Sequence, residues 1–179
     1  MSEVPILRTE RLVLRGHRIE DFAAMAAMYA QPDTVRFIGA GEPHSQEVVW
    51  SRLQRAAGAW RMLGYGFFVI EHAASGRVIG EAGFLERFAP GKGPRTPEAG
   101  WALETSTRGQ GYAGEAMAAI LAWADERFQR TTCVIAPENT PSIALARRLG
   151  FRETGVEPAP PDWTGPEFLR FERSAALGS

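Results

Sequence analysis

The chain of 179 residues contains one cysteine, Cys133, and three histidines that lie far apart in sequence. A single cysteine excludes an internal disulfide and a zinc site built on paired thiolates. The three histidines, His17, His44 and His72, show no metal-ligand spacing, so we expect no metal. The first ten residues lack the apolar core of a secretory signal, and no apolar run approaches the roughly 20 residues of a membrane helix. We therefore predict a cytoplasmic protein with no membrane partner.

An excess of charge of either sign is also missing, because 20 basic and 21 acidic residues give a formal net charge of −1. Binding to nucleic acid through bulk charge requires a basic excess, so we expect no nucleic-acid partner. Lys92 is the single lysine, and the other basic residues are arginines. This bias is compatible with anion recognition, but it agrees better with the coding bias of a GC-rich genome.

Hydrophobic periodicity predicts a mixed α/β fold in which helices and strands alternate along the chain. The predicted helices cover residues 20–30, 45–63, 113–128 and 141–149, and the predicted strands cover 11–17, 66–72, 77–88, 98–104, 131–136, 152–156 and 168–173. Three consecutive strands favour antiparallel pairing, and the strand–helix–strand unit after them supplies a parallel pair. We expect a central sheet of about six to seven strands with helices on both faces. The length predicts one domain over residues 1–179, with a core at about 7–173. We expect a monomer or a homodimer.

The most informative segment is Arg108-Gly109-Gln110-Gly111-Tyr112-Ala113, between a predicted strand and a predicted helix. Its two glycines permit positive φ and a close approach of the backbone to a ligand. The start of the helix offers unpaired N–H groups and the positive end of the helix dipole. These features predict a pyrophosphate site to which Arg108 adds charge, with an ordinary glycine turn as the alternative. The segment matches neither the P-loop nor the three-glycine dinucleotide fingerprint.

Three spaced motifs resemble the GNAT superfamily of N-acetyltransferases. Arg108-x-x-Gly111-x-Ala113 resembles its acetyl-CoA motif, and Asn139-Thr140-Pro141-Ser142 with Leu149-Gly150-Phe151 resembles its second cofactor segment. The stretches 7–15 and 109–116 resemble the corresponding sequences of the family branch that contains the ribosomal-protein N-terminal acetyltransferases (RimJ/RimL-like). The resemblance implies a GNAT fold in which the fourth and fifth strands splay apart and acetyl-CoA binds between them.

The resemblance also implies the residues that bind acetyl-CoA. Backbone N–H groups near Ala102 or Leu103 would polarise the thioester carbonyl, and Asn139 would hydrogen-bond the pantetheine arm. The other implied cofactor-binding residues are Arg108, Gly109, Gln110, Gly111, Tyr112, Ala113 and Ser142. In the alternative reading, Asn139 is only a turn former before a proline, and Ser142 only belongs to the start of the following helix.

Direct transfer of an acetyl group to an amine, which the resemblance implies, requires a base, because the amine is mostly protonated at pH 7. Glu98 stands where many family members supply a catalytic carboxylate, although a surface glutamate at a strand end is the alternative. Glu81, on the neighbouring strand, faces either the cleft or solvent. The tyrosine that often protonates the leaving thiolate in this family corresponds to Ala146, which leaves Ser142 or water for that step. Cys133 has no local activating group, so we interpret it as a core residue rather than an acyl-accepting nucleophile.

These features together predict an acetyl-CoA-dependent N-acetyltransferase that acts on a small-molecule or peptide amine, including a protein N-terminus. The missing tyrosine keeps one alternative open, a GNAT domain that binds CoA as a sensor without turnover. Segments 36–44 and 89–97 and the proline-rich loop around Trp163 are expected to select the acceptor. Their sequences do not identify it.

Overall fold

The computed structural model describes residues 4–86, 96–157 and 167–175. The chain groups into two compact units, Met1–Leu85 with Gly100–Ile120 and Glu86–Ala99 with Leu121–Ser179. Strand β5 (Glu98–Leu103) and helix α4 (Tyr112–Asp125) pass from one unit to the other. The expectation of a single domain stays a prediction.

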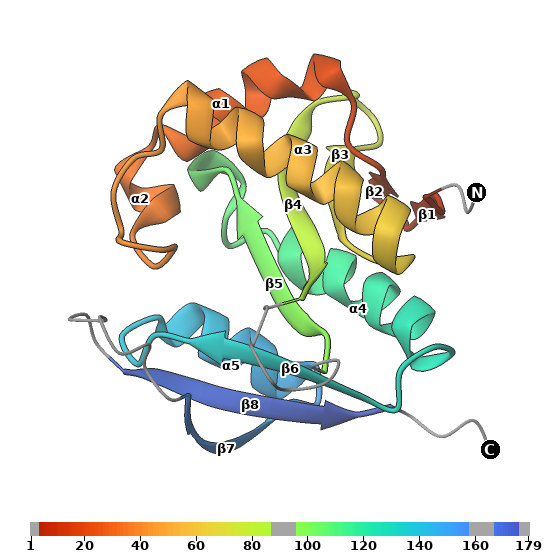
Figure 1. Cartoon of the computed structure of the whole chain (residues 1–179), viewed down its shortest axis with the longest axis vertical. Helices are drawn as coiled ribbons and strands as arrows, with labels where there is room; N and C mark the ends of the chain where they lie inside the picture. The colour runs from red at the N-terminus through yellow and green to blue at the C-terminus, as the bar shows by residue number, and fades with distance from the viewer. Residues whose placement is uncertain (1–3, 87–95, 158–166, 176–179) are drawn as a thin grey trace. The chain divides into compact units, whose positions relative to one another are not determined.

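The remaining elements agree closely with the predicted order (Figure 1). The first unit also contains β1 (Leu7–Arg8), β2 (Leu12–Arg15), η1 (Ile19–Asp21), α1 (Phe22–Tyr29), α2 (Pro32–Val35), α3 (Gln46–Leu63), β3 (Phe67–His72), β4 (Val78–Leu85) and η2 (Thr105–Thr107). The second unit also contains β6 (Arg130–Ile135), α5 (Thr140–Arg148), β7 (Arg152–Glu157) and β8 (Phe168–Ser174). The short helix α2 was not predicted, because its four residues are too few to show a helical period.

The strands form one mixed sheet in the order β1-β2-β3-β4-β5-β6-β8-β7. Pairing is antiparallel from β1 to β4 and among β6, β8 and β7, and it is parallel between β5 and β6, where Glu98 faces Thr132. The mixed sheet confirms the predicted fold class. The sheet has eight strands rather than six or seven. The strand missing from the prediction, β1, has two residues and cannot show alternation.

Helices α1 and α3 contribute to the core of the first unit, and they run close together in Figure 1. The side chain of Ser45 accepts a hydrogen bond from the Val48 N–H and caps the start of α3, as predicted. Gly64, with φ of +74°, ends the helix in the left-handed conformation. Five buried residues of this region form one apolar cluster: Met25, Met28, Tyr29, Val35 and Val49.

In the second unit, β8 pairs along its length with β6 on one side and with β7 on the other, and α5 packs against β6 (Figure 1). Arg173 of β8 makes a two-pronged ion pair with Asp125 at the end of α4, with N–O distances of 2.5 and 2.7 Å. The predicted helix over 113–128 ends at Asp125, so Phe128 lies beyond it and packs edge-on against Trp123.

Two of the segments predicted to select the acceptor lie wholly or largely outside the residues that the structure describes. Trp163 lies outside the described residues, as do all but the last two residues of segment 89–97. Among the described helices, none combines the length and apolar character needed to cross a bilayer.

Candidate active site

Residues 108–113, which we call the phosphate loop, connect the end of β5 and the η2 turn to α4. Gly109 and Gly111 have φ of +76° and +82°, in the left-handed region that glycine adopts without strain. The carbonyl of Gly111 accepts a hydrogen bond from the Glu115 N–H at 3.0 Å, the type of bond that starts a helix. The loop therefore turns directly into the N-terminus of α4.

The exposed backbone of this loop has the chemistry of an anion site. The first N–H groups of α4 have no partner inside the helix, and the positive end of its dipole lies at the same place. Residues 108–111 are exposed, and a Cβ built on Gly109 would meet no heavy atom within 4 Å. The backbone is thus open to a ligand, and the donors fit a pyrophosphate.

The polar side chains of the loop bind backbone carbonyls nearby. Arg108 Nη2 donates to the carbonyl of Asp33 in α2 at 3.0 Å, and Gln110 Nε2 donates to the carbonyl of Ser106 at 3.2 Å. These bonds hold the loop against its own unit while Arg108 keeps its positive charge at the site. Arg108 therefore helps to shape the loop besides adding charge to it.

Ala102 and Leu103 lie at the end of β5 that precedes this loop. Leu103 is buried, and Ala102 packs against the apolar cluster of the first unit. The Glu104 N–H donates to the Ile79 carbonyl at 2.9 Å and joins β5 to β4. A Cβ on Gly80 would lie 2.3 Å from the carbonyl oxygen of Ala102, so this close approach of the strands requires glycine. The role of the two backbone N–H groups in polarising a carbonyl stays a prediction.

Glu81 of β4 is buried, and both of its carboxylate oxygens have partners. Oε1 accepts from the Tyr29 hydroxyl at 2.5 Å and from Arg52 Nη2 at 2.7 Å. Oε2 lies 2.9 Å from His17 Nε2. The same Arg52 nitrogen donates to the Tyr29 hydroxyl at 2.8 Å, so the four side chains form one network. Glu81 therefore faces the helices that cover β4 and not solvent.

The network keeps Glu81 ionised. Burial on its own raises the pKa of this carboxyl, but the hydrogen bond to His17 and the positive charge of Arg52 more than offset it, and the pKa falls to about 2. Burial and the neighbouring negative charge of Glu81 raise the pKa of Tyr29 well above its ordinary value. A carboxylate of such low pKa is a weak proton acceptor at neutral pH.

Sequence reasoning missed the partners of Glu81. His17 follows β2, Tyr29 ends α1 and Arg52 lies within α3. They are between 29 and 64 residues from Glu81 along the chain. No local pattern marks them. Three nitrogens around this network are buried and lack a protein partner among the described residues: His17 Nδ1, His44 Nδ1 and Arg52 Nε. His44 stacks on the Tyr29 ring with centroids 5.1 Å apart.

Glu98 begins β5 and is 9% exposed, so it is a buried carboxylate rather than a surface residue. Its neighbour Cys133 on β6 is buried as well. Burial and the negative charge of Glu98 raise the pKa of the Cys133 thiol to about 12. Cys133 is thus a protonated core residue at neutral pH, which matches its interpretation from the sequence.

Asn139 and Ser142 lie at the start of α5. Asn139 is the N-cap, and its side-chain oxygen accepts a hydrogen bond from the Ser142 N–H at 3.3 Å. The capping alternative from the sequence is therefore present in the structure. The cap uses one lone pair of the Asn139 oxygen, and the amide NH₂ is the donor that Asn139 can offer to a ligand.

The two roles of Asn139 separate in a pair of variants. Asn139→Asp keeps the capping oxygen but has no NH₂ donor, whereas Asn139→Ala loses both. If the amide binds the pantetheine arm, Asn139→Asp should retain wild-type stability and weaken acetyl-CoA binding by about tenfold, the cost of one hydrogen bond. Asn139→Ala should show the same loss and also unfold about 1 kcal/mol more easily. Calorimetric titration and thermal unfolding of both variants test this, and unchanged affinity in Asn139→Asp would leave Asn139 with the capping role alone.

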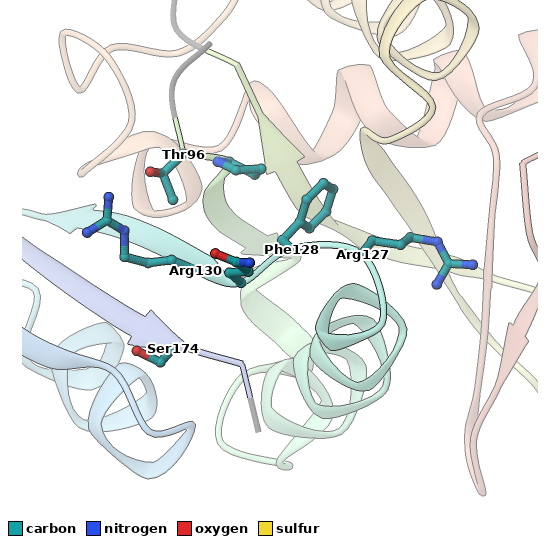
Figure 2. A pocket seen from close by; sticks show the side chains of 7 residues that line it. Thr96, Arg127, Phe128, Arg130 and Ser174 are labelled. Atoms are coloured by element: carbon teal, nitrogen blue, oxygen red, sulfur yellow. The ribbon is translucent and has the colours of Figure 1, made fainter. Parts of the chain in front are cut away.

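A separate cavity of about 660 Å³ lies in the second unit. Figure 2 shows Phe128 between Arg127 and Arg130, whose side chains extend in opposite directions. The lining residues are Thr96, Pro97, Arg127, Phe128, Gln129, Arg130 and Ser174. None of the predicted catalytic or acetyl-CoA-binding residues lines this cavity. Arg127 Nη1 donates hydrogen bonds there to the carbonyl oxygen of Trp123 and to the carboxylate of Glu126.

The predicted site residues divide between the two units. The phosphate loop, Glu81, Ala102 and Leu103 belong to the first unit, and Glu98, Asn139 and Ser142 belong to the second. Within the first unit, the η2 turn joins the strand end that carries Ala102 and Leu103 to the loop. Among the described residues, no group of three or more histidine, cysteine, aspartate or glutamate side chains is arranged to hold a metal ion.

The sequence also matches a known protein family. Residues 11–152 match the family model of the acetyltransferase (GNAT) domain, which is well over half of the chain. The chain belongs to this family, and it is an acetyl-CoA-dependent acetyltransferase. The match confirms the resemblance found in the sequence motifs.

Individual relatives support the same assignment. A structure from Bordetella pertussis, assigned to the GNAT-family acetyltransferases, is 36% identical with a TM-score of 0.80, covering 95% of this chain and 99% of that chain. YoaA of Bacillus subtilis (strain 168), described as an uncharacterized N-acetyltransferase, is 26% identical over 154 residues, 85% of each protein. RimL, a ribosomal-protein α-N-acetyltransferase solved with coenzyme A, is 19% identical with a TM-score of 0.78, covering 95% of this chain and 98% of that chain. At that identity the likeness to RimL shows the fold alone.

Proposed function

We propose that this acetyltransferase moves the acetyl group directly from acetyl-CoA to a primary amine, with both substrates bound at once. A covalent acetyl-enzyme through cysteine is disfavoured, because Cys133 is buried and its thiol has a pKa of about 12. A nucleophilic cysteine requires a lowered pKa and exposure. Direct attack by the amine avoids that requirement.

The phosphate loop is the observation that carries the proposal. Its two left-handed glycines and the start of α4 are assigned to the pyrophosphate of acetyl-CoA, with Arg108 adding charge. The backbone N–H groups of Ala102 or Leu103 polarise the thioester carbonyl. Asn139, through its amide NH₂, holds the pantetheine arm.

The proton balance assigns roles to two further residues. The ammonium form of the acceptor loses one proton to Glu98, directly or through water, and the neutral nitrogen attacks the thioester carbon. A C–N bond forms as the C–S bond breaks, and the second proton that the nitrogen loses passes through Ser142 or water to the CoA thiolate, which leaves an amide and free CoA thiol. We assign the base to Glu98 rather than Glu81, because the pKa of Glu81 is held near 2 by its partners.

The acceptor is a protein N-terminus or a small-molecule amine. Both carry the primary amine that this chemistry needs, and the fold is shared with RimL, a ribosomal-protein α-N-acetyltransferase. The balanced net charge of −1 gives no support to a polycationic acceptor.

The test is an acceptor screen that follows release of free thiol from acetyl-CoA, with a matched pair of loop variants. Gly109 and Gly64 have φ of +76° and +74°, and a Cβ at either would meet nothing within 4 Å. Gly109→Ala and Gly64→Ala should therefore lose similar stability, about 1 kcal/mol, from left-handed strain. In Gly109→Ala the added methyl group also lies on the part of the phosphate-loop backbone that we propose binds the pyrophosphate.

We expect the wild-type protein and Gly64→Ala to release one thiol per amine acetylated. Gly109→Ala should bind acetyl-CoA at least tenfold more weakly by calorimetry. Equal affinities in the two variants would show that the phosphate loop does not hold the pyrophosphate. Absence of thiol release with every amine tested would overturn direct transfer to primary amines.

A further inference from the structure

A group of polar contacts joins the turn between β1 and β2 to the first helical turn of α4. Oε1 of Glu115 accepts from the Thr9 hydroxyl at 2.5 Å and from the Arg11 backbone N–H at 2.9 Å. Oε2 accepts from Arg11 Nε at 2.7 Å and lies 2.6 Å from Arg11 Nη2. Both oxygens of Glu115 are therefore occupied, and the pair with Arg11 has the two-pronged geometry of strong ion pairs.

The remaining nitrogen of Arg11 contacts the phosphate loop itself. Arg11 Nη1 donates to the carbonyl oxygen of Gln110 at 3.0 Å. The guanidinium carbon of Arg11 lies 4.5 Å from the centre of the Tyr112 ring, within the range of a cation–π contact. One arginine thus contacts the helix start and holds one peptide group of the loop.

That hydrogen bond fixes the direction of a donor. The peptide group between Gln110 and Gly111 is planar and trans, so its C=O and N–H point in opposite directions. Because Arg11 holds the C=O, the N–H of Gly111 points away from Arg11. A peptide next to glycine rotates readily, and a rotated peptide would turn a carbonyl oxygen toward the position of the N–H. An oxygen in that position would repel an anion.

We infer that Arg11 and Glu115 are positioning residues for acetyl-CoA, which fix the Gln110–Gly111 peptide with its N–H toward the bound pyrophosphate. This inference rests on the proposed function of the phosphate loop. Glu115 holds Arg11 in place through three contacts, and Arg11 neutralises a carboxylate that would otherwise stand beside an anion site. Although burial raises the pKa of Glu115, the bonds from Thr9 and Arg11 hold it below its ordinary value, so the ion pair persists at neutral pH.

The test compares two acetyl donors, acetyl-CoA and S-acetylpantetheine, which lacks the pyrophosphate and the nucleotide. Arg11→Met should raise KM for acetyl-CoA by about tenfold and change kcat by less than about threefold, because uniform binding is lost. Its KM for S-acetylpantetheine should stay unchanged. Arg11→Lys keeps the charge but not the fork of donors, so its KM should lie between those of Arg11→Met and the wild type.

Glu115→Gln isolates the second residue of the pair. It keeps one oxygen for the bonds from the Thr9 hydroxyl and the Arg11 backbone N–H, and it loses both the charge and the oxygen that accepts from the Arg11 guanidinium, so KM for acetyl-CoA should rise about threefold. In the double variant Arg11→Met with Glu115→Gln, KM for acetyl-CoA should exceed that of Arg11→Met alone by less than about twofold, because the two residues act through the same contacts.

Arg127 offers a matched control. It donates to the Trp123 carbonyl at 2.6 Å, pairs with Glu126 at 3.0 Å and lies 4.5 Å from the Trp123 ring centre. Its side chain is 42% exposed, against 40% for Arg11. Arg127→Met therefore removes the same kinds of contact in the segment that follows α4, which contains no predicted cofactor-binding residue, and it should leave KM unchanged for both donors.

The outcomes separate failure of this inference from failure of the proposed function. If Arg11→Met raises KM equally for both donors, or only lowers the melting temperature, the positioning role is overturned. If Arg11→Met fails to fold, Arg11→Lys and Glu115→Gln decide by the same comparison of donors. If the wild-type protein uses S-acetylpantetheine as efficiently as acetyl-CoA, the pyrophosphate role of the loop is wrong instead.

Discussion

Replacing Glu98 by glutamine is expected to lower turnover about 10²-fold at neutral pH and to leave the affinity for acetyl-CoA unchanged. Glutamine has nearly the shape of glutamate, so the buried start of β5 should keep its packing. What it lacks is the ability to accept a proton from the ammonium group of the acceptor. Steady-state rates and calorimetric titration with acetyl-CoA measure the two quantities separately.

The loss in Glu98→Gln should shrink as pH rises, because the amine is then already neutral in solution and needs no base. Cys133→Ala is the matched control on the neighbouring strand, since it removes a buried group that takes no part in direct transfer. Its turnover per folded molecule should equal that of the wild type. Wild-type rates in Glu98→Gln would discard Glu98 as the base, and loss of turnover in Cys133→Ala would bring back an acetyl-enzyme.

Local sequence patterns were sufficient for most of the elements and for the backbone conformation of the phosphate loop. The apolar stripe from Val49 to Trp60, together with Ser45 before it, predicted the start and extent of α3, because a helix period and a cap are both local features. Gly109 and Gly111 predicted backbone with positive φ at a helix start. This too is a local feature, because a glycine adopts that conformation through its own lack of a side chain.

The contacts that place the site side chains could not be read in this way. Glu81 was left open between the cleft and solvent, because its partners come from three segments that are remote in sequence. Arg11 and Glu115 are separated by 104 positions, and although each lies in one of the motif stretches 7–15 and 109–116, neither motif shows that the two residues pair. Pairing at such distance depends on how the strands and helices pack, and a single sequence gives no record of that packing.

Removing the Glu81 side chain is expected to destabilise the protein by about 3 kcal/mol or more. In Glu81→Ala, Arg52 keeps its charge and the Tyr29 hydroxyl and His17 lose their acceptor, and breaking a buried ion pair at one partner typically costs this much. Arg52 is 22% exposed, so water relieves part of the loss. Urea unfolding of the variant and the wild type at pH 7 measures the difference.

The pH dependence gives a second test of the same network. The pKa of Glu81 falls from its ordinary 4.5 to about 2 on folding, which corresponds to about 3 kcal/mol. A depressed pKa contributes stability above the unfolded value, and this contribution is lost as pH falls from about 4.5 toward 2. Glu81→Gln cannot titrate, so its free energy of unfolding should approach that of the wild type over this range. A difference that stays constant from pH 6 to pH 3 would contradict the ionised network.

Glu153→Gln is the control for a carboxylate paired at the surface. Glu153 is 42% exposed and lies 3.2 Å from Arg147, so solvent screens the pair and its loss should change stability by less than about 1 kcal/mol at any pH. The comparison removes general effects of losing one negative charge. The specific effect of Glu81 is what remains.

Turnover of folded Glu81→Gln then separates its structural role from a catalytic one. A carboxylate with a pKa of about 2 is a poor base for an ammonium group, because proton transfer to it is strongly uphill. We therefore expect single-turnover rates within about tenfold of the wild type once the unfolded fraction is subtracted. The remaining effect would come from small shifts of β4. A loss of about 10²-fold with wild-type affinity for acetyl-CoA would transfer the role of base from Glu98 to Glu81, and the two glutamine variants measured side by side decide between them.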